Sequence, residues 1–194
     1  AGSTTITASQ AGNDNYNAAT SVTQSLTVSK ANSSITATGS SSFTYTGSAQ
    51  GPATSTVTGS TGAVTYSYSG VSPTVYSASS TAPTNVGTYE VIASVAADDN
   101  YNAATSAALA FSITKADQTI TFGALSTLTY SPSGTSNLSA SSSSGLTVTY
   151  SSSNTAVATV SGSTLSIIGA GSTTITASQA GNDNYNAATS VTQS

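Results

Sequence analysis

Residues 1–30 read AGSTTITASQAGNDNYNAATSVTQSLTVSK, and this stretch decides the fold class. In its second half the apolar residues Val22, Leu26 and Val28 fall on one parity, while Ser and Thr occupy the other. Side chains of a strand point alternately to its two faces, so the pattern predicts a strand with one apolar and one hydroxyl-covered face. A second apolar-bearing segment surrounds Ile6, and a polar run lies between the two. The stretch therefore predicts a β-hairpin.

The same stretch shows that the chain is repetitive. Residues 1–25 recur letter for letter as residues 170–194, and a degenerate copy, DNYNAATS, occupies residues 99–106. Such self-similarity has to be interpreted before any fold is assigned. We predict that two related kinds of repeat unit alternate, and we call them type A and type B. The chain then has three segments: the C-terminal hairpin of a truncated type B unit at 1–30, a type A domain at 31–115, and a type B domain at 116–194 whose last strand is missing. Both ends of the chain then fall inside domains, and we expect the parent protein to continue in both directions.

The alternation continues through both larger segments. The inward positions that we predict are Ile35, Ala37, Val64, Tyr66, Tyr68, Tyr89, Val91, Ala93, Val95, Ala107, Leu109, Phe111 and Ile113 in type A, and Ile120, Phe122, Leu146, Val148 and Tyr150 in type B. A further strand is expected at 164–168. Several short strands with regular turn signals predict an all-β fold of tandem immunoglobulin-like β-sandwiches. Only 116–118 separate the two domains, and so short a connection predicts an extended, semi-rigid rod.

Composition excludes several classes of function. Ser and Thr supply 77 of the 194 residues, charged residues only 4%, and the net charge is −4. Two Lys and no Arg cannot neutralise a nucleic-acid backbone, and they also argue against docking on anionic membrane. Without Cys, neither a disulfide nor a thiolate metal site can form. No segment approaches the length of apolar chain that spans a bilayer.

Two resemblances cover the whole chain. Type B resembles bacterial immunoglobulin-like repeats of the group 2 kind, through GLTVTYSSSNTAVATV at 145–160, IGAG at 168–171 and TITA at 174–177. Type A resembles the MBG domain, through FTYTGSAQ at 43–50, Gly87-Thr88-Tyr89 and the Asn-Tyr-Asn loop. The resemblance implies alternating domains of a giant bacterial surface adhesin, although the charge is unusually low for such a protein.

The resemblance also implies a function. We expect a structural repeat segment, the stalk or filament shaft of a large secreted adhesin on the bacterial cell surface, which projects a distal tip for adhesion, biofilm formation or gliding. Its expected partners are neighbouring repeats of the same chain and, through strand donation into type B, other copies of the chain in a filament; an arbitrary cut explains the missing strand equally well. The alternative is a module that binds glycans or ice through exposed Tyr or Thr faces.

The polar loop at 13–17, 98–102 and 182–186 is the first candidate site. Its oxygen-bearing side chains fit a Ca²⁺ site, yet each type B loop holds one acid, which is little charge for a hard cation. The other interpretation is a hairpin loop, because Asn and Asp cap turns with their own side chains and tolerate left-handed backbone. The Tyr of the loop would then pack on the edge of the sandwich.

The remaining candidates are weaker. Lys30 and Lys115 have two interpretations. Each could form an intramolecular isopeptide bond to an Asn or Asp, or each could simply be exposed at the end of a strand. Asn32 and Asn137 begin glycosylation sequons, but in a chain so rich in Ser and Thr such sequons arise readily by chance and say little about glycosylation. The chain lacks His and Cys, and only Asp98 and Asp99 are adjacent acids. We therefore predict no enzyme, no catalytic, cofactor-binding or metal residues, and no cofactor.

Overall fold

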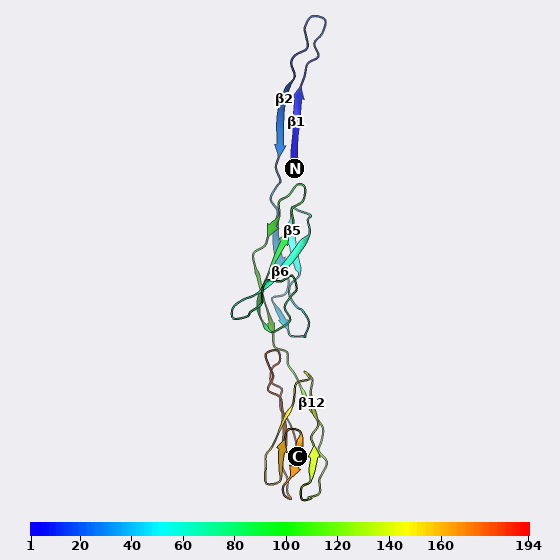
Figure 1. Cartoon of the computed structure of the whole chain (residues 1–194), viewed down its shortest axis with the longest axis vertical. Helices are drawn as coiled ribbons and strands as arrows, with labels where there is room; N and C mark the ends of the chain where they lie inside the picture. The colour runs from blue at the N-terminus through cyan, green and yellow to red at the C-terminus, as the bar shows by residue number, and fades with distance from the viewer. The chain divides into compact units, whose positions relative to one another are not determined.

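The computed structural model describes all residues from 1 to 194, and every regular element in it is a β-strand (Figure 1). The all-β prediction is therefore confirmed, and several small sheets fit β-sandwiches. The chain forms two compact units. The first contains Ala1–Ser41, Ala49–Pro83 and Thr88–Ser112, and the second contains Ser42–Ser48, Thr84–Gly87 and Ile113–Ser194. The chain contains no helix that could cross a membrane.

The N-terminal segment is a two-stranded hairpin of β1 (Gly2–Ala8) and β2 (Val22–Val28), as the alternation predicts. Its antiparallel register runs from Gly2 opposite Val28 to Ala8 opposite Val22. Both strands are exposed along their whole length, and 57% of Ile6 is accessible to solvent. The predicted apolar face therefore exists, but within this chain nothing covers it.

Type A is built from two facing sheets. Its strands are β3 (Ser34–Thr38), β4 (Ser42–Thr44), β5 (Thr54–Thr58), β6 (Val64–Gly70), β7 (Gly87–Val95), β8 (Ala104–Thr105) and β9 (Leu109–Thr114). One sheet pairs β3 with β5, and the other has the order β4-β9-β7-β6, with β8 attached to β7. Apolar side chains of β3 and β7 meet in one cluster, which indicates that the core lies between the sheets.

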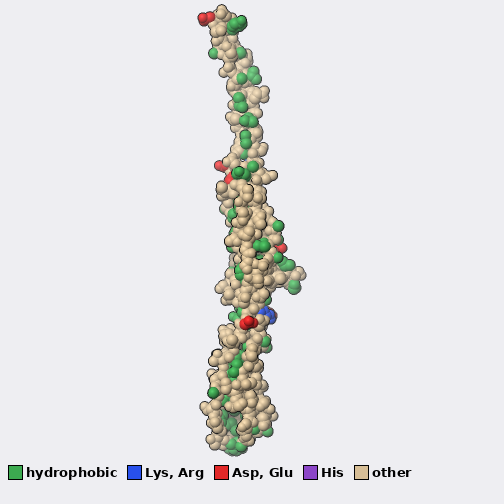
Figure 2. Space-filling model, turned by 180° about the vertical axis from the view of Figure 1, so that it is seen from behind, with side chains coloured by type: hydrophobic (Ala, Val, Ile, Leu, Met, Phe, Trp, Pro, Cys, Tyr) green, Lys and Arg blue, Asp and Glu red, His purple; other side chains and the backbone are tan.

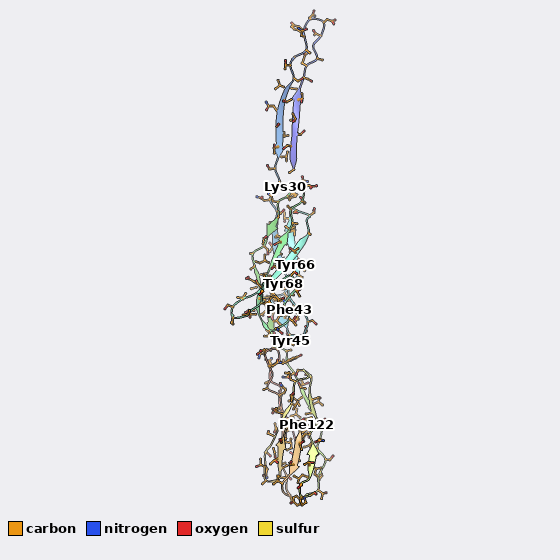
Figure 3. The ribbon with its side chains drawn as sticks, viewed as in Figure 1. Lys30, Phe43, Tyr45, Tyr66, Tyr68 and Phe122 are labelled. Carbon is orange, nitrogen blue, oxygen red and sulfur yellow. The ribbon has the colours of Figure 1, made fainter.

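The type A core follows the predicted period of two. In β7, Tyr89, Val91, Ala93 and Val95 are all buried, whereas the residues between them are not. Tyr89 stacks on Phe111 with ring centroids 5.5 Å apart, and Phe111 also meets the edge of Tyr68 at 6.2 Å. Because Tyr68 is buried, its hydroxyl needs an acceptor, and it donates to the carbonyl of Pro52 at 2.9 Å. Its burial raises its pKa. Figure 3 shows Tyr66 and Tyr68 on the neighbouring strand β6.

Type B holds three small sheets around one core. Its strands are β10 (Ile120–Phe122), β11 (Thr135–Asn137), β12 (Ala140–Ser142), β13 (Thr149–Ser152), β14 (Ala158–Ser161), β15 (Thr164–Ile167), β16 (Ile175–Ser178) and β17 (Val191–Gln193). The sheet orders are β10-β12, β11-β15-β14 and β13-β16-β17. The core contains Phe122, Leu138, Leu165 and Ile175, and Tyr150 packs against it from β13.

Two predicted inward positions, Ala107 and Val64, are exposed in the structure. Ala107 is exposed because the last strand of type A starts at Leu109; before it the chain turns at Ser106, whose buried hydroxyl accepts from the N–H of Ala93 at 3.0 Å and donates to the carbonyl of Ala107. Val64 is 37% exposed because it is the first residue of β6, at the end of the sheet. Leu146 is half-buried between two exposed residues, as its inward position predicts, but β13 starts only at Thr149.

Candidate functional site

Three loops of the chain fold identically around an Asn or Asp side chain, and we call them the Asx loops: Asn13–Asn17, Asp98–Asn102 and Asn182–Asn186. In each, Oδ1 of the first residue accepts hydrogen bonds from the backbone N–H groups two and three residues later, at 2.8 to 3.0 Å. The N–H of the first residue in turn donates to the carbonyl of the Tyr, at 2.9 to 3.1 Å. This confirms the interpretation as a hairpin loop capped by its own side chain.

In types A and B the Asx loop also binds the first residues of the same domain, and we call this contact the start clamp. In type A, the N–H of Ala31 donates to the carbonyl of Asn100 at 2.9 Å, and the N–H of Asn102 donates to the carbonyl of Ala31 at 2.8 Å. The same bonds recur in type B, where Ala116 takes the place of Ala31 and the distances are 3.0 and 2.9 Å. Each domain therefore begins with a short parallel bridge, Ala31 to Tyr101 and Ala116 to Tyr185.

Side chains reinforce the start clamp in the same way in both domains. The Nζ of Lys30 donates to the carbonyl of Asp98 at 2.5 Å, and the Nζ of Lys115 donates to the carbonyl of Asn182 at 2.7 Å. Both lysines are exposed, and each contacts a main-chain oxygen rather than a side-chain carboxyl or amide. This geometry fits the interpretation as exposed strand ends and offers no isopeptide partner. Figure 3 shows Lys30 where the chain leaves the hairpin and begins type A.

In types A and B the last residue of the Asx loop adds an amide contact. The Nδ2 of Asn102 donates to Oδ1 of Asn32 at 3.0 Å, and the Nδ2 of Asn186 donates to Oδ1 of Asp117 at 2.8 Å. The residue pairs at the two domain starts thus differ in charge but not in geometry. The side chains of two lysines, the backbone of two alanines and several side-chain amides thus build the same clamp twice.

Asp98 distinguishes the type A loop from the type B loop. Its second carboxylate oxygen accepts from the N–H and the hydroxyl of Thr61, at 2.8 and 3.2 Å. The bond from the backbone of Thr61, followed by those from Asn100 and Tyr101, lowers the pKa of Asp98 to about 2. Hydrogen bonds to a carboxylate favour its charged form. The carboxylate therefore ties the Asx loop to the turn after β5 at neutral pH.

The Tyr of the Asx loop packs on bare backbone in type A. Gly59, with a φ of +102°, lies under the ring of Tyr101, and a Cβ placed there would come within 2.9 Å of Cδ1 of that ring. Glycine is needed at this position both for the close approach and for the left-handed backbone. The expected packing of this Tyr is confirmed for Tyr101, whereas Tyr16 in the unpartnered hairpin is 75% exposed.

Inside the second compact unit, two loops of the type A sequence lie against the type B Asx loop. Oδ1 of Asn184 accepts from the N–H of Val86 at 3.0 Å, and its Nδ2 donates to Oδ1 of Asn85 at 3.2 Å. Tyr45 and Tyr185 meet edge to face, with centroids 5.3 Å apart. The loop that closes on the start of type B thus also binds the sequence that precedes it.

A buried glutamine behind the type B clamp was missed by sequence reasoning. Gln118 is only 6% exposed, and its Nε2 donates to the carbonyl of Asn186 at 2.7 Å and to Oε1 of Gln179. Its Oε1 accepts from the hydroxyls of Ser142 and Ser144. The signal was present, because Gln118 shares the inward parity of Ile120 and Phe122. An inward polar residue next to a domain start marks a hydrogen-bonded centre.

The structure brings no three acidic side chains together. In each Asx loop the oxygen that would be the first ligand of a cation already accepts two backbone N–H groups. The expectations of no metal, no cofactor and no catalytic residue remain predictions.

Comparison with known protein families finds a match for part of the chain. Residues 33–117 match the family model described as MBG domain, in agreement with the predicted resemblance of type A. An MBG domain is a repeat domain of bacterial surface proteins, so the match supports a structural repeat. No curated protein matches the chain. No solved structure matches it either. The resemblance of type B to group 2 immunoglobulin-like repeats remains a prediction.

Proposed function

We propose that this chain is a spacer segment of a large bacterial surface adhesin, which holds a distal binding region away from the cell. The protein acts outside the cell, catalyses nothing, and has neighbouring repeats of its own chain as its main partners. The MBG match supports the repeat character. The surface also suits an inert spacer, since Figure 2 shows few charged side chains on the face in view.

The start clamp is the observation that carries the proposal. A spacer has to keep its geometry at every joint, and here the same backbone bridge, Lys contact and amide contact recur at both domain starts. Most of these bonds join neutral groups, so salt screens them little. A clamp of this kind would hold each domain start in the same conformation at low and at high ionic strength.

The decisive test uses a matched pair of variants that the repeat itself provides. Asn184 lies in the type B clamp and contacts Val86 and Asn85, whereas its twin Asn15 has the same sequence context in the free hairpin. We expect Asn184→Ala to broaden the distribution of dimensions in small-angle X-ray scattering of the full chain. Asn15→Ala should leave that distribution unchanged.

A second arm of the test adds one more 169-residue period to the chain. A spacer predicts a maximum dimension that grows by a fixed increment with each added period, at low and at high salt. Unchanged scattering for Asn184→Ala, or an added period that leaves the maximum dimension the same, would contradict the proposal.

One observation favours the alternative, a module that binds ice or glycans. On the exposed side of the β3–β5 sheet three hydroxyl pairs lie directly opposite each other: Ser34 and Thr58, Thr36 and Thr56, and Thr38 and Thr54. In the last pair the hydroxyl of Thr38 donates to the hydroxyl of Thr54 at 3.0 Å, so fewer hydrogen-bonding groups of this pair remain for a ligand. Thermal hysteresis, or glycan-array binding, that disappears in Thr36→Val would support this function over the spacer.

A further inference from the structure

The ten tyrosines of the chain differ in what their hydroxyls contact. Hydrogen bonds within the chain occupy the hydroxyls of Tyr66, Tyr68, Tyr76 and Tyr150. Tyr89 is buried in the type A core. The hydroxyls of the remaining five make no hydrogen bond within the chain: Tyr16, Tyr45, Tyr101, Tyr130 and Tyr185. A free phenol at the surface is the form of tyrosine that an external oxidant reaches.

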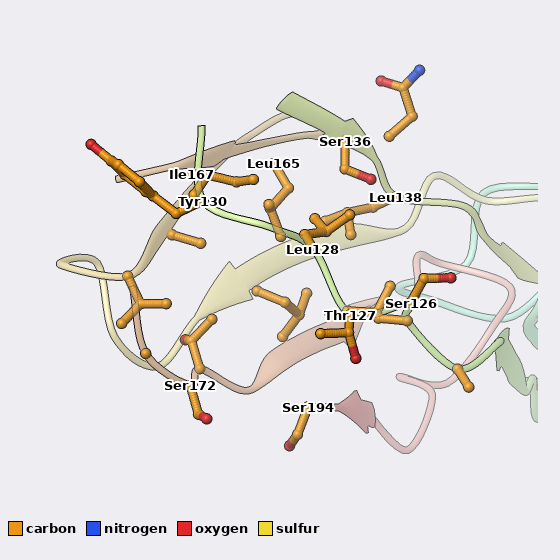
Figure 4. Close-up of a pocket in the computed structure, with 18 of the residues that line it drawn as sticks. Ser126, Thr127, Leu128, Tyr130, Ser136, Leu138, Leu165, Ile167, Ser172 and Ser194 are labelled. Atoms are coloured by element: carbon orange, nitrogen blue, oxygen red, sulfur yellow. The ribbon is translucent and has the colours of Figure 1, made fainter. Parts of the chain in front are cut away.

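Two of these five tyrosines, Tyr45 and Tyr185, lie against each other. Their ring centroids are 5.3 Å apart, and the rings meet edge to face at 81°. The other three lie apart from any second free phenol. Tyr16 is 75% exposed in the hairpin, and Tyr101 has its ring on glycine backbone. Tyr130 lies on the wall of a type B pocket that no other tyrosine lines (Figure 4).

The backbone holds both members of the Tyr45–Tyr185 pair in place. The N–H of Tyr45 donates to the carbonyl of Thr114 at 2.9 Å, which fixes it beside the end of β9. The N–H of Tyr185 donates to Oδ1 of Asn182 at 2.9 Å, and its carbonyl accepts from the N–H of the same residue at 3.1 Å. Both tyrosines are half-buried and belong to the second compact unit. The two rings are therefore held together by the fold and are still accessible to solvent.

We propose that Tyr45 and Tyr185 form a site of oxidative cross-linking, where a one-electron oxidant such as a haem peroxidase with hydrogen peroxide joins the two rings as dityrosine. Each phenol loses one electron and its hydroxyl proton, which leaves a radical shared between the oxygen and the Cε atoms. The two radicals form a carbon–carbon bond through one Cε of each ring. The hydrogen on each of these carbons then moves as a proton to the phenol oxygen, which restores both aromatic rings. The chain loses two hydrogen atoms, and one molecule of hydrogen peroxide takes them up to become two of water.

The arrangement of the pair favours this coupling over any other in the chain. In an edge-to-face pair, ring carbons of one tyrosine point at the other ring. Rotation about the side-chain bonds then brings one Cε of each ring together. Partners that a fold holds side by side react without the encounter that separate molecules need. In dilute solution the pair therefore couples before an isolated phenol such as Tyr16 meets a second copy of the chain.

The bond would lie where it holds the type B start clamp closed. Tyr185 belongs to the Asx loop and forms the parallel bridge with Ala116, while Tyr45 follows β4 in the type A sequence. A cross-link between distant points of a chain restricts the unfolded state and stabilises the fold. Opening the clamp would then require more than the loss of its hydrogen bonds. This inference concerns the chemistry of the pair and does not depend on the spacer function.

The test treats the full chain in dilute solution with a haem peroxidase and hydrogen peroxide. We expect dityrosine fluorescence, a monomer that is lighter by two hydrogen atoms, and a peptide map that joins residue 45 to residue 185. Tyr45→Phe keeps the ring and removes the phenol, so it should lower the yield of this monomeric product by at least about tenfold. Tyr76→Phe is the matched control. Tyr76 also meets a tyrosine edge to face, 5.9 Å away, but its hydroxyl donates to a carbonyl and its partner Tyr89 is buried. This variant should keep the full yield.

The same treatment of the unfolded chain in urea shows whether the fold directs the reaction. We expect the coupling to spread over many tyrosines there, without preference for the Tyr45–Tyr185 pair. Three results would overturn the proposal: a folded chain that gives no dityrosine, a Tyr45→Phe chain that gives as much monomeric product as the original, or a map in which other tyrosines carry the bond. Because Phe preserves the ring packing, circular dichroism of both variants should match that of the natural chain.

Discussion

The twin isoleucines allow a direct measurement of what the type B body contributes to stability. Ile175 is 1% exposed and packs in the core, so Ile175→Ala removes buried methyl groups and leaves a cavity, a change that costs about 2–5 kcal/mol. Ile6 has identical neighbours in sequence but is 57% exposed. Ile6→Ala should change the free energy of unfolding by no more than about 0.5 kcal/mol. For a domain of this size the difference corresponds to a shift in Tm of about 6–40 °C.

The assay is thermal unfolding followed by circular dichroism at low protein concentration, with hydrogen exchange to assign the transition. Amides of β13 and β16 should lose protection in Ile175→Ala, while amides of β7 in type A should keep it. Two equally destabilised variants, or two unaffected ones, would refute the reasoning. Either outcome would mean that burial of β16 does not distinguish the twins.

The other predictions concern the clamp and its surroundings. The folded-state pKa of Asp98 is depressed to about 2, so its contribution to stability is complete above its ordinary pKa of 3.8 and is lost as the pH falls through 2. Protection of the Thr61 amide against hydrogen exchange should fall over that window of pH. Asp98→Asn should remove this pH dependence. Gln118→Ala should lower the free energy of unfolding by about 2–3 kcal/mol, because hydroxyls such as that of Ser142 lose a buried acceptor, as denaturant titration will show. Lys115→Met should change stability by less than about 0.5 kcal/mol, and the intact mass of the natural chain should show no loss of ammonia or water from an isopeptide bond.

The predictions for Asp98 and Gln118 each have a control within the chain. Asp183 is exposed, and Asp183→Asn should leave protection of the Thr61 amide unchanged at every pH. Ser33 occupies the position of Gln118 in type A, and its hydroxyl accepts a single bond, from the N–H of Ser60 at 3.0 Å. Ser33→Ala should therefore cost about 1 kcal/mol, less than Gln118→Ala. A pH-independent Thr61 amide, a neutral Gln118→Ala or a mass deficit would contradict the corresponding prediction.

Much of the fold could be predicted because apolar and polar residues alternate along many of its strands. The inward set on β7, the buried Phe111 and Ile113 of β9, and the buried Ile120 and Phe122 of β10 follow directly from period-two patterning. Strand β5 was missed for the same reason, because Thr54, Thr56 and Thr58 are polar and only Val57 marks its inner face. Local pattern predicted which face of a strand is apolar, but it could not predict whether another strand covers that face. Ile6 and Ile175 have identical surroundings in sequence, and only the strands packed against them decide which one is buried.

The candidate site was predictable in part. Asn and Asp at a hairpin tip favour turns that their side chains cap, and this prediction was correct for all three Asx loops. The partners of the lysines could not be read from the sequence, because Lys30 and Lys115 bind carbonyl oxygens of the main chain. Any residue can supply such an oxygen, so no letter in the sequence marks it. Gln118 was available to inspection, since its parity placed it inside.

The Asx loops use only one oxygen of their first side chain to hold the turn, and that oxygen is common to an amide and a carboxylate. Asn13, Asp98 and Asn182 therefore give the same loop with or without a negative charge. Direct hydrolysis of the side-chain amide of Asn182 by water would release ammonia and leave a carboxylate, which adds a negative charge to the loop and keeps the oxygen that holds its turn. The loop would thus become more acidic without losing its fold.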